Sequence, residues 1–75
     1  MYDFNLYEVV YEVLSMNGGD NVRRASSFCL FRNAAYVAER LSLANDVVGE
    51  VNIINGLTGE VEATFDRGRE TYLNL

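Results

Sequence analysis

The side chains of this sequence that are suited to chemistry are mainly carboxylates. Glu60 and Glu62 are two residues apart, and Glu8 and Glu12 are four apart, so each pair would share one face of a strand. General acid–base catalysis requires two carboxyl groups in different environments, with the pKa of one of them raised by burial. The alternating pattern assigns both pairs to a solvated face, and we therefore expect surface carboxylates rather than a catalytic pair.

Nucleophilic catalysis has little basis in this sequence. Cys29 is the single cysteine, and the chain has no histidine to act as its base. Arg32 could face the thiol from about one helical turn away, but a free cysteine is more often a small buried apolar side chain, and we expect Cys29 to be one. The serines lack a histidine or lysine partner as well. We therefore predict a protein that is not an enzyme.

The common ligand-binding motifs are missing or misplaced. The acidic residues are spread over several segments and do not form a calcium-binding loop, and one cysteine without histidine cannot build an ordinary zinc site. The glycine-containing residues 17–20 fall between two expected strands rather than before a helix, and they carry Asp20 where a phosphate would sit. We expect neither a metal nor another cofactor.

The charge of the chain favours a basic partner. Eleven acidic residues face six basic ones, all of them arginine, which gives a net charge of −5. Acidic residues dominate residues 1–20 and 45–75, whereas residues 21–44 are basic. Such a field repels phosphate backbones and attracts cationic surfaces. We attribute the absence of lysine to a genome that favours arginine codons rather than to selection on this protein.

Length and hydropathy indicate a single small domain over residues 1–75. The hydrophobic fraction of 49% suffices for a packed core, although a chain of 75 residues is stable only by a small margin. There is no run of about 18 apolar residues to span a membrane, and the acidic start does not resemble a signal peptide. We expect a cytoplasmic protein without a membrane partner.

Residues 47–65 form the most clearly patterned segment, and they predict a β-hairpin. Two alternating apolar and polar stretches flank Asn55, Gly56 and Gly59. Asn and Gly tolerate the positive φ that a tight hairpin turn requires, so Asn55-Gly56 predicts such a turn. Gly59 is suited to the left-handed position of a bulged closure.

The other segments complete an α+β domain. Alternation predicts strands over residues 4–14 and 70–75, with a turn at Gly68 before the second of these. Residues 22–28 are most economically a further strand that returns antiparallel to the first. Residues 25–31 could instead begin the helix early. A helix is expected over about residues 30–44, with a buried stripe made of Leu30, Phe31, Ala34, Val37, Ala38 and Leu41. The predicted architecture is a single-domain ββαβββ fold, a mostly antiparallel sheet with one helix packed on one face.

One helix covers only one face of such a sheet, so the opposite face, here called the open face, must point outward. Alternation assigns it most of the strand glutamates, interleaved with apolar side chains. We predict that the partner-binding residues are Glu8, Glu12, Glu50, Glu60, Glu62, Val10 and Ile54. Apolar residues on an uncovered face favour a contact surface, although scattered surface hydrophobic residues would give the same pattern.

The leading hypothesis is a non-enzymatic protein-binding module that uses its acidic sheet face against a basic protein surface. A homodimer formed through a sheet face or an exposed edge strand is a further expectation. In size, acidity and architecture, the chain also resembles small proteins of phages and mobile elements. Several of those proteins inhibit host nucleic-acid machinery by presenting carboxylates in place of phosphates. The resemblance implies an alternative, an inhibitor that mimics nucleic acid and blocks a nucleic-acid-binding enzyme.

A third hypothesis is an RNA-binding sheet. Arg23, Arg24, Arg67 and Arg69 would form one basic strip if the second strand and the last turn were neighbours. The net negative charge argues against direct nucleic-acid binding, because it removes the nonspecific attraction to phosphates.

Overall fold

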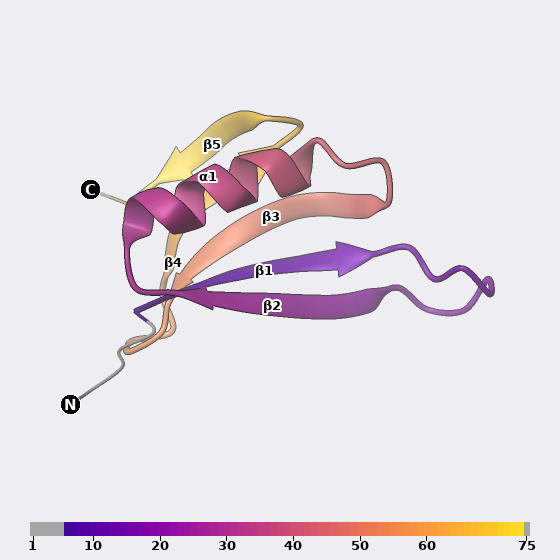
Figure 1. The fold of residues 1–75 in the computed structure, drawn as a ribbon, viewed down its shortest axis with the longest axis horizontal. Helices are drawn as coiled ribbons and strands as arrows, with labels where there is room; N and C mark the ends of the chain where they lie inside the picture. The colour runs from indigo at the N-terminus through magenta and orange to yellow at the C-terminus, as the bar shows by residue number, and fades with distance from the viewer. Residues whose placement is uncertain (1–5, 75) are drawn as a thin grey trace.

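A computed structural model describes residues 6–74 of the chain. Two strands precede the helix and three follow it (Figure 1). The elements are β1 (Tyr7–Val13), β2 (Val22–Phe28), α1 (Phe31–Ser42), β3 (Val47–Asn55), β4 (Val61–Asp66) and β5 (Arg69–Leu73). The predicted ββαβββ order and the α+β class are therefore confirmed, and residues 22–28 form a strand rather than an early start of the helix. The predicted start of the first strand, at residues 4–5, and the predicted end of the last, at residue 75, lie outside the described residues.

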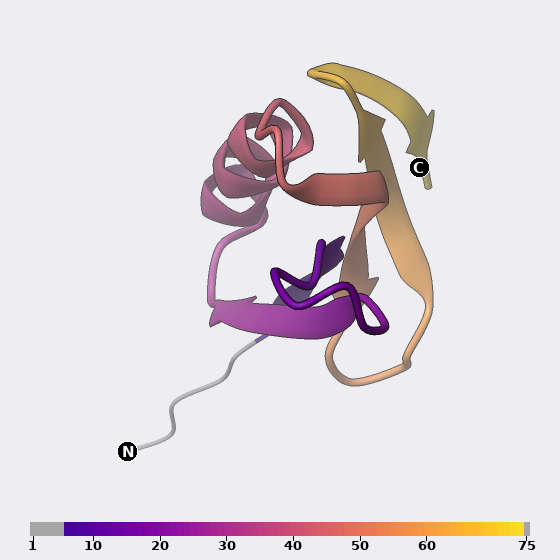
Figure 2. The same cartoon turned by 90° about the vertical axis from the view of Figure 1, so that its right-hand side faces the viewer.

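The five strands form one antiparallel sheet in the order β2-β1-β3-β4-β5. Short connections join β1 to β2, β3 to β4 and β4 to β5, whereas α1 carries the chain from β2 across to β3 on the other side of β1. The sheet twists between the β1–β2 pair and the β4–β5 pair, and α1 lies on one side of it (Figure 2). β2 and β5 are the two edges.

The core lies between α1 and the central strands. Val9, Val51 and Ile53 are completely buried, and Ala34 and Ala38 of the helix pack against them. The two alanines are small, so the helix backbone can approach the sheet closely. The helix is shorter than the predicted residues 30–44. Leu30 does not belong to the buried stripe, because it precedes the helix as its N-cap in an extended conformation and is about half exposed.

The β3–β4 turn forms where it was predicted, but by a different mechanism. Asn55 and Gly56 do not adopt positive φ; instead, the side-chain oxygen of Asn55 accepts hydrogen bonds from the N–H groups of Leu57 (2.8 Å) and Thr58 (3.1 Å). Gly59, with φ of 80°, takes the left-handed position, as predicted.

The β4–β5 turn consists of Arg67 and Gly68, which have φ angles of 52° and 83°. Two successive left-handed residues between the paired Asp66 and Arg69 are typical of a type I′ hairpin turn. The prediction of positive φ at Gly68 is confirmed. A Cβ on this residue would also lie 2.9 Å from the Cδ2 of Leu43, so the turn packs closely against the end of α1.

The prediction of a buried Cys29 is wrong. Its side chain is exposed, because the residue occupies the bend between the edge strand β2 and α1, outside the core cluster.

Candidate partner-binding face

The strand register determines which side chains share the open face, which no helix covers within residues 6–74 (Figure 2). Val9, Ile53 and Ala63 point into the core, so their neighbours in the strands point away from it. Cross-strand pairing arranges these neighbours in three rows. The rows are Arg23–Glu12–Val48, Ala25–Val10–Asn52–Thr64–Tyr72 and Ser27–Glu8–Ile54–Val61.

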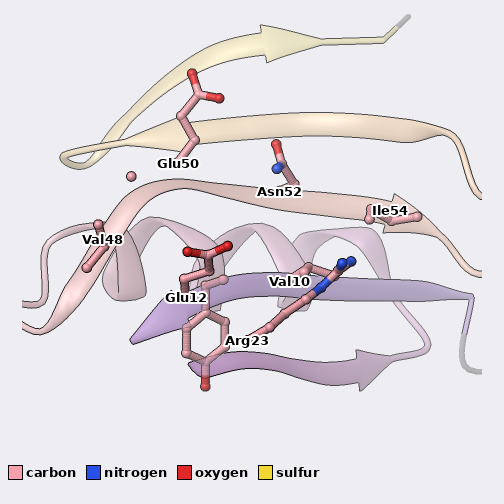
Figure 3. Close-up of a pocket in the computed structure, with 9 residues that line it drawn as sticks. Val10, Glu12, Arg23, Val48, Glu50, Asn52 and Ile54 are labelled. Carbon is pink, nitrogen blue, oxygen red and sulfur yellow. The ribbon is translucent and has the colours of Figure 1, made fainter. Parts of the chain in front are cut away.

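A shallow pocket of about 400 Å³, here called the open-face hollow, lies on this face. Its lining comes from β1, β2 and β3 and comprises Val10, Tyr11, Glu12, Arg23, Val48, Gly49, Glu50, Asn52 and Ile54. Glu12 on β1 and Glu50 on β3 lie toward the same end of the hollow as Val48, while Ile54 lies at the other end (Figure 3). The open-face hollow therefore combines apolar side chains with two carboxylates.

A β-bulge accompanies the open-face hollow. Between the pairs Val10–Asn52 and Glu12–Val48, β1 advances by two residues while β3 advances by four. Gly49, with φ of 75°, lies in the longer stretch, where glycine takes the left-handed conformation at little cost. The extra residues bend β3 away from the regular ladder beside Glu12, and they place Glu50 beside the hollow.

The predicted site residues differ in how accessible they are. Val10 is only 8% exposed although it lies on the side of the sheet away from α1, so it belongs to the floor of the hollow rather than to its rim. Ile54 and Glu8 are half-buried and paired across β1 and β3, and Glu12 and Glu50 are exposed. The structure thus brings Glu12, Glu50, Val10 and Ile54 together at the hollow and places Glu8 beside Ile54.

Glu60 and Glu62 do not join this group. A second bulge inserts Glu62 between the pairs Ile54–Val61 and Ile53–Ala63, so that Val61, rather than a glutamate, lies opposite Ile54. The Glu62 carboxylate accepts hydrogen bonds from the side-chain amides of Asn55 (3.0 Å) and Asn74 (3.4 Å). Glu62 also lines a small pocket with Tyr7 and Phe31, on the helix side of the sheet. Its assignment to the open face was wrong, because regular alternation does not continue through a bulge.

Glu60 precedes β4 and lies in the β3–β4 connection, where its N–H donates to the hydroxyl of Thr58 (3.2 Å). It is exposed, but it does not line the open-face hollow. Its expected role as a neighbour of Glu62 on one strand face is therefore not supported by the geometry.

The sequence interpretation assigned Arg23 to a possible basic strip and did not include it among the partner-binding residues. Arg23 is the cross-strand partner of Glu12, and its side chain extends over the sheet beside Val10 (Figure 3). Opposite charges at facing positions of the β1–β2 hairpin are the signal that could have revealed it. Arg23 and Arg24 lie on the edge strand β2, whereas Arg67 and Arg69 lie at the opposite edge, so the four arginines do not form the single strip that the RNA-binding hypothesis required.

Within residues 6–74, no group of three or more cysteine or acidic side chains is placed to hold a metal ion. The helix of the described part of the chain is too short to cross a membrane. No family model, curated protein or solved structure matches this chain.

Proposed function

We propose that this protein is a non-enzymatic binding module whose open face docks on a basic protein surface. The observation that carries the proposal is the open-face hollow, where exposed Glu12 and Glu50 accompany the apolar side chains of Val10, Val48 and Ile54. A protein-binding surface of this kind needs apolar contact area together with charges that orient the partner.

The chemistry of the open-face hollow suits an arginine or lysine side chain. The methylene groups of such a side chain can pack on Val10 and Val48, while its charged head group reaches Glu12 or Glu50. The net charge of −5 adds a long-range attraction to the same class of partner and speeds the encounter at low salt. We therefore place the centre of the interface at Glu12 and Glu50, and not at the β4 glutamates.

The test compares two double variants that have the same net charge. Glu12→Lys with Glu50→Lys reverses the charge of the hollow, and Glu39→Lys with Glu70→Lys makes the same change on α1 and β5. Each double variant changes the net charge from −5 to −1. Glu39 and Glu70 are exposed and do not line the open-face hollow.

Each protein is immobilised and used to capture partners from a native lysate at several salt concentrations. We expect the wild type and the Glu39/Glu70 variant to retain the same basic protein, and the Glu12/Glu50 variant to lose it. Retention should weaken as salt rises, since the contacts are ionic. Equal loss in both variants would mean that only bulk charge matters, and retention by the Glu12/Glu50 variant would remove the hollow from the interface.

A further inference from the structure

A second, larger concavity lies on the other side of the sheet, where the β1–β2 hairpin extends beyond the C-terminal end of α1 (Figure 1). This concavity, here called the hairpin groove, has a volume of about 820 Å³. Its walls include Val13, Leu14, Met16, Val22, Arg24 and Asp46. Apart from Tyr11, which lines both, the groove is separate from the open-face hollow, and the inference below does not depend on the proposed function.

The hairpin groove is rich in exposed apolar surface. Leu14 and Val22 are each about half exposed, and Met16 is 99% exposed. These side chains come from the loop after β1 and from the start of β2, and within residues 6–74 no element is packed over them. Apolar side chains gathered in a concavity, rather than scattered singly, favour a contact with another molecule.

The charges of the groove indicate what that molecule is. Arg24 lies on the β2 wall, and Asp46 lies on the wall formed by the connection between α1 and β3; β1 runs between β2 and β3. The N–H of Leu14 donates to the backbone carbonyl of Asp46 (2.8 Å), which ties the second wall to the end of β1. A partner whose contacting charges all had the same sign would be repelled by either Arg24 or Asp46. A second copy of this chain, turned by a two-fold axis, would place Arg24 of each copy opposite Asp46 of the other.

We infer that the hairpin groove is the interface of a symmetric homodimer. A two-fold interface requires a self-complementary patch, and an apolar floor between one cation and one anion satisfies that requirement. A standard interface buries about 800 Å² on each partner, which is roughly a seventh of the 5367 Å² surface of this chain. Dimerisation also supplies apolar burial that so short a chain lacks alone. Because the groove and the open face lie on opposite sides of the sheet, the dimer presents two open faces.

The proposal is tested by sedimentation velocity on the full chain, from about 1 µM to about 1 mM, a range that brackets the dissociation constants of weak and moderate complexes. The wild type is expected to shift from the 8.4 kDa monomer to twice that mass as concentration rises. Leu14→Asp with Met16→Asp should keep the protein monomeric throughout. The matched control is Leu30→Asp with Leu57→Asp, which adds the same charge at two exposed leucines outside the groove and should dimerise like the wild type.

A charge exchange tests the two-fold arrangement itself. Arg24→Asp and Asp46→Arg should each weaken self-association, because like charges then face each other across the axis. An equimolar mixture of the two variants should restore a one-to-one dimer. In that mixed dimer, each contact between position 24 of one copy and position 46 of the other again joins opposite charges.

Three results of these association experiments would overturn the inference. They are a wild type that stays monomeric at the highest concentration, a dimer that persists in the Leu14/Met16 variant, and a mixture of the Arg24 and Asp46 variants that associates no better than either alone. Binding of an amphipathic helical peptide by a monomeric wild type would assign the groove to a different chain and would likewise overturn it.

Discussion

The hydroxyl of Ser42, at the end of α1, accepts a hydrogen bond of 2.8 Å from the backbone N–H of Gly68 in the β4–β5 turn. The same hydroxyl donates to the carbonyl oxygen of Glu39 (2.7 Å), and Ser42 is almost completely buried. The β4–β5 turn lies at the edge of the sheet opposite β2. The hydrogen bond therefore fixes the C-terminal end of α1 over that edge.

Replacement of Ser42 by alanine should therefore destabilise the fold. The Gly68 N–H would lose its acceptor in a partly buried site, which costs about 1–3 kcal/mol. The free energy of unfolding, measured by urea denaturation, should fall by this amount. The matched control is Ser27→Ala on the exposed part of β2, which should change it very little. An equal, small effect of both substitutions would show that the hydrogen bond does not stabilise the helix end.

Arg67→Asn should stabilise the protein. Arg67 is held at φ of 52°, which asparagine adopts more readily than arginine, and Asn-Gly is a preferred pair for a type I′ turn. The free energy of unfolding should rise by up to about 1 kcal/mol, because the substitution removes part of the cost of holding an L-residue in the left-handed conformation. Thermal unfolding of Arg67→Asn and of Arg69→Asn, which removes the same charge in β5, measures the effect. A gain of the same size at both positions would assign it to charge rather than to backbone conformation.

Asn55→Ala should weaken the β3–β4 hairpin. The substitution removes the acceptor of the Leu57 and Thr58 N–H groups and the donor to Glu62, and we expect a loss of about 1–2 kcal/mol. Asn55→Asp retains the acceptor but places a second carboxylate next to Glu62. If the turn hydrogen bonds dominate, the aspartate variant will be the more stable of the two in urea denaturation. The reverse order would show that the contact with Glu62 matters more.

Arg23→Ala should strengthen binding of the basic partner. Arg23 is the cross-strand neighbour of Glu12 and lines the open-face hollow, so its guanidinium repels an arginine or lysine side chain of the partner. Removal of an exposed charge of this kind should raise the affinity by up to about fivefold, as measured by titration calorimetry with the captured partner. Arg32→Ala on α1 is the control of equal charge. A loss of affinity in Arg23→Ala would mean that Arg23 itself contacts the partner.

The sequence predicted the fold better than it predicted the site. Alternation identified β1, β3, β4 and β5, while β2 was inferred as the strand that returns beside β1. The positive φ of Gly59 and Gly68 followed from residue type, because it depends on local conformation. Glu62 was misassigned since a bulge interrupts the alternation beside it, and no residue in β4 marks that bulge. Arg23 was left out of the predicted partner-binding residues because its place beside Glu12 depends on how β2 is aligned with β1.

The sequence alone predicts an acidic α+β domain in which one amphipathic helix leaves one face of a sheet uncovered. It could do so because hydrophobic periodicity and net charge are properties of neighbouring residues or of the whole composition. The folding of distant segments onto one another brings Glu12 and Glu50 to one hollow, turns Glu62 to the helix side, and makes Arg24 and Asp46 line the same hairpin groove. Those placements arise from bulges and strand alignment, which are set by hydrogen bonds between segments distant in the chain and leave no periodic trace within either segment.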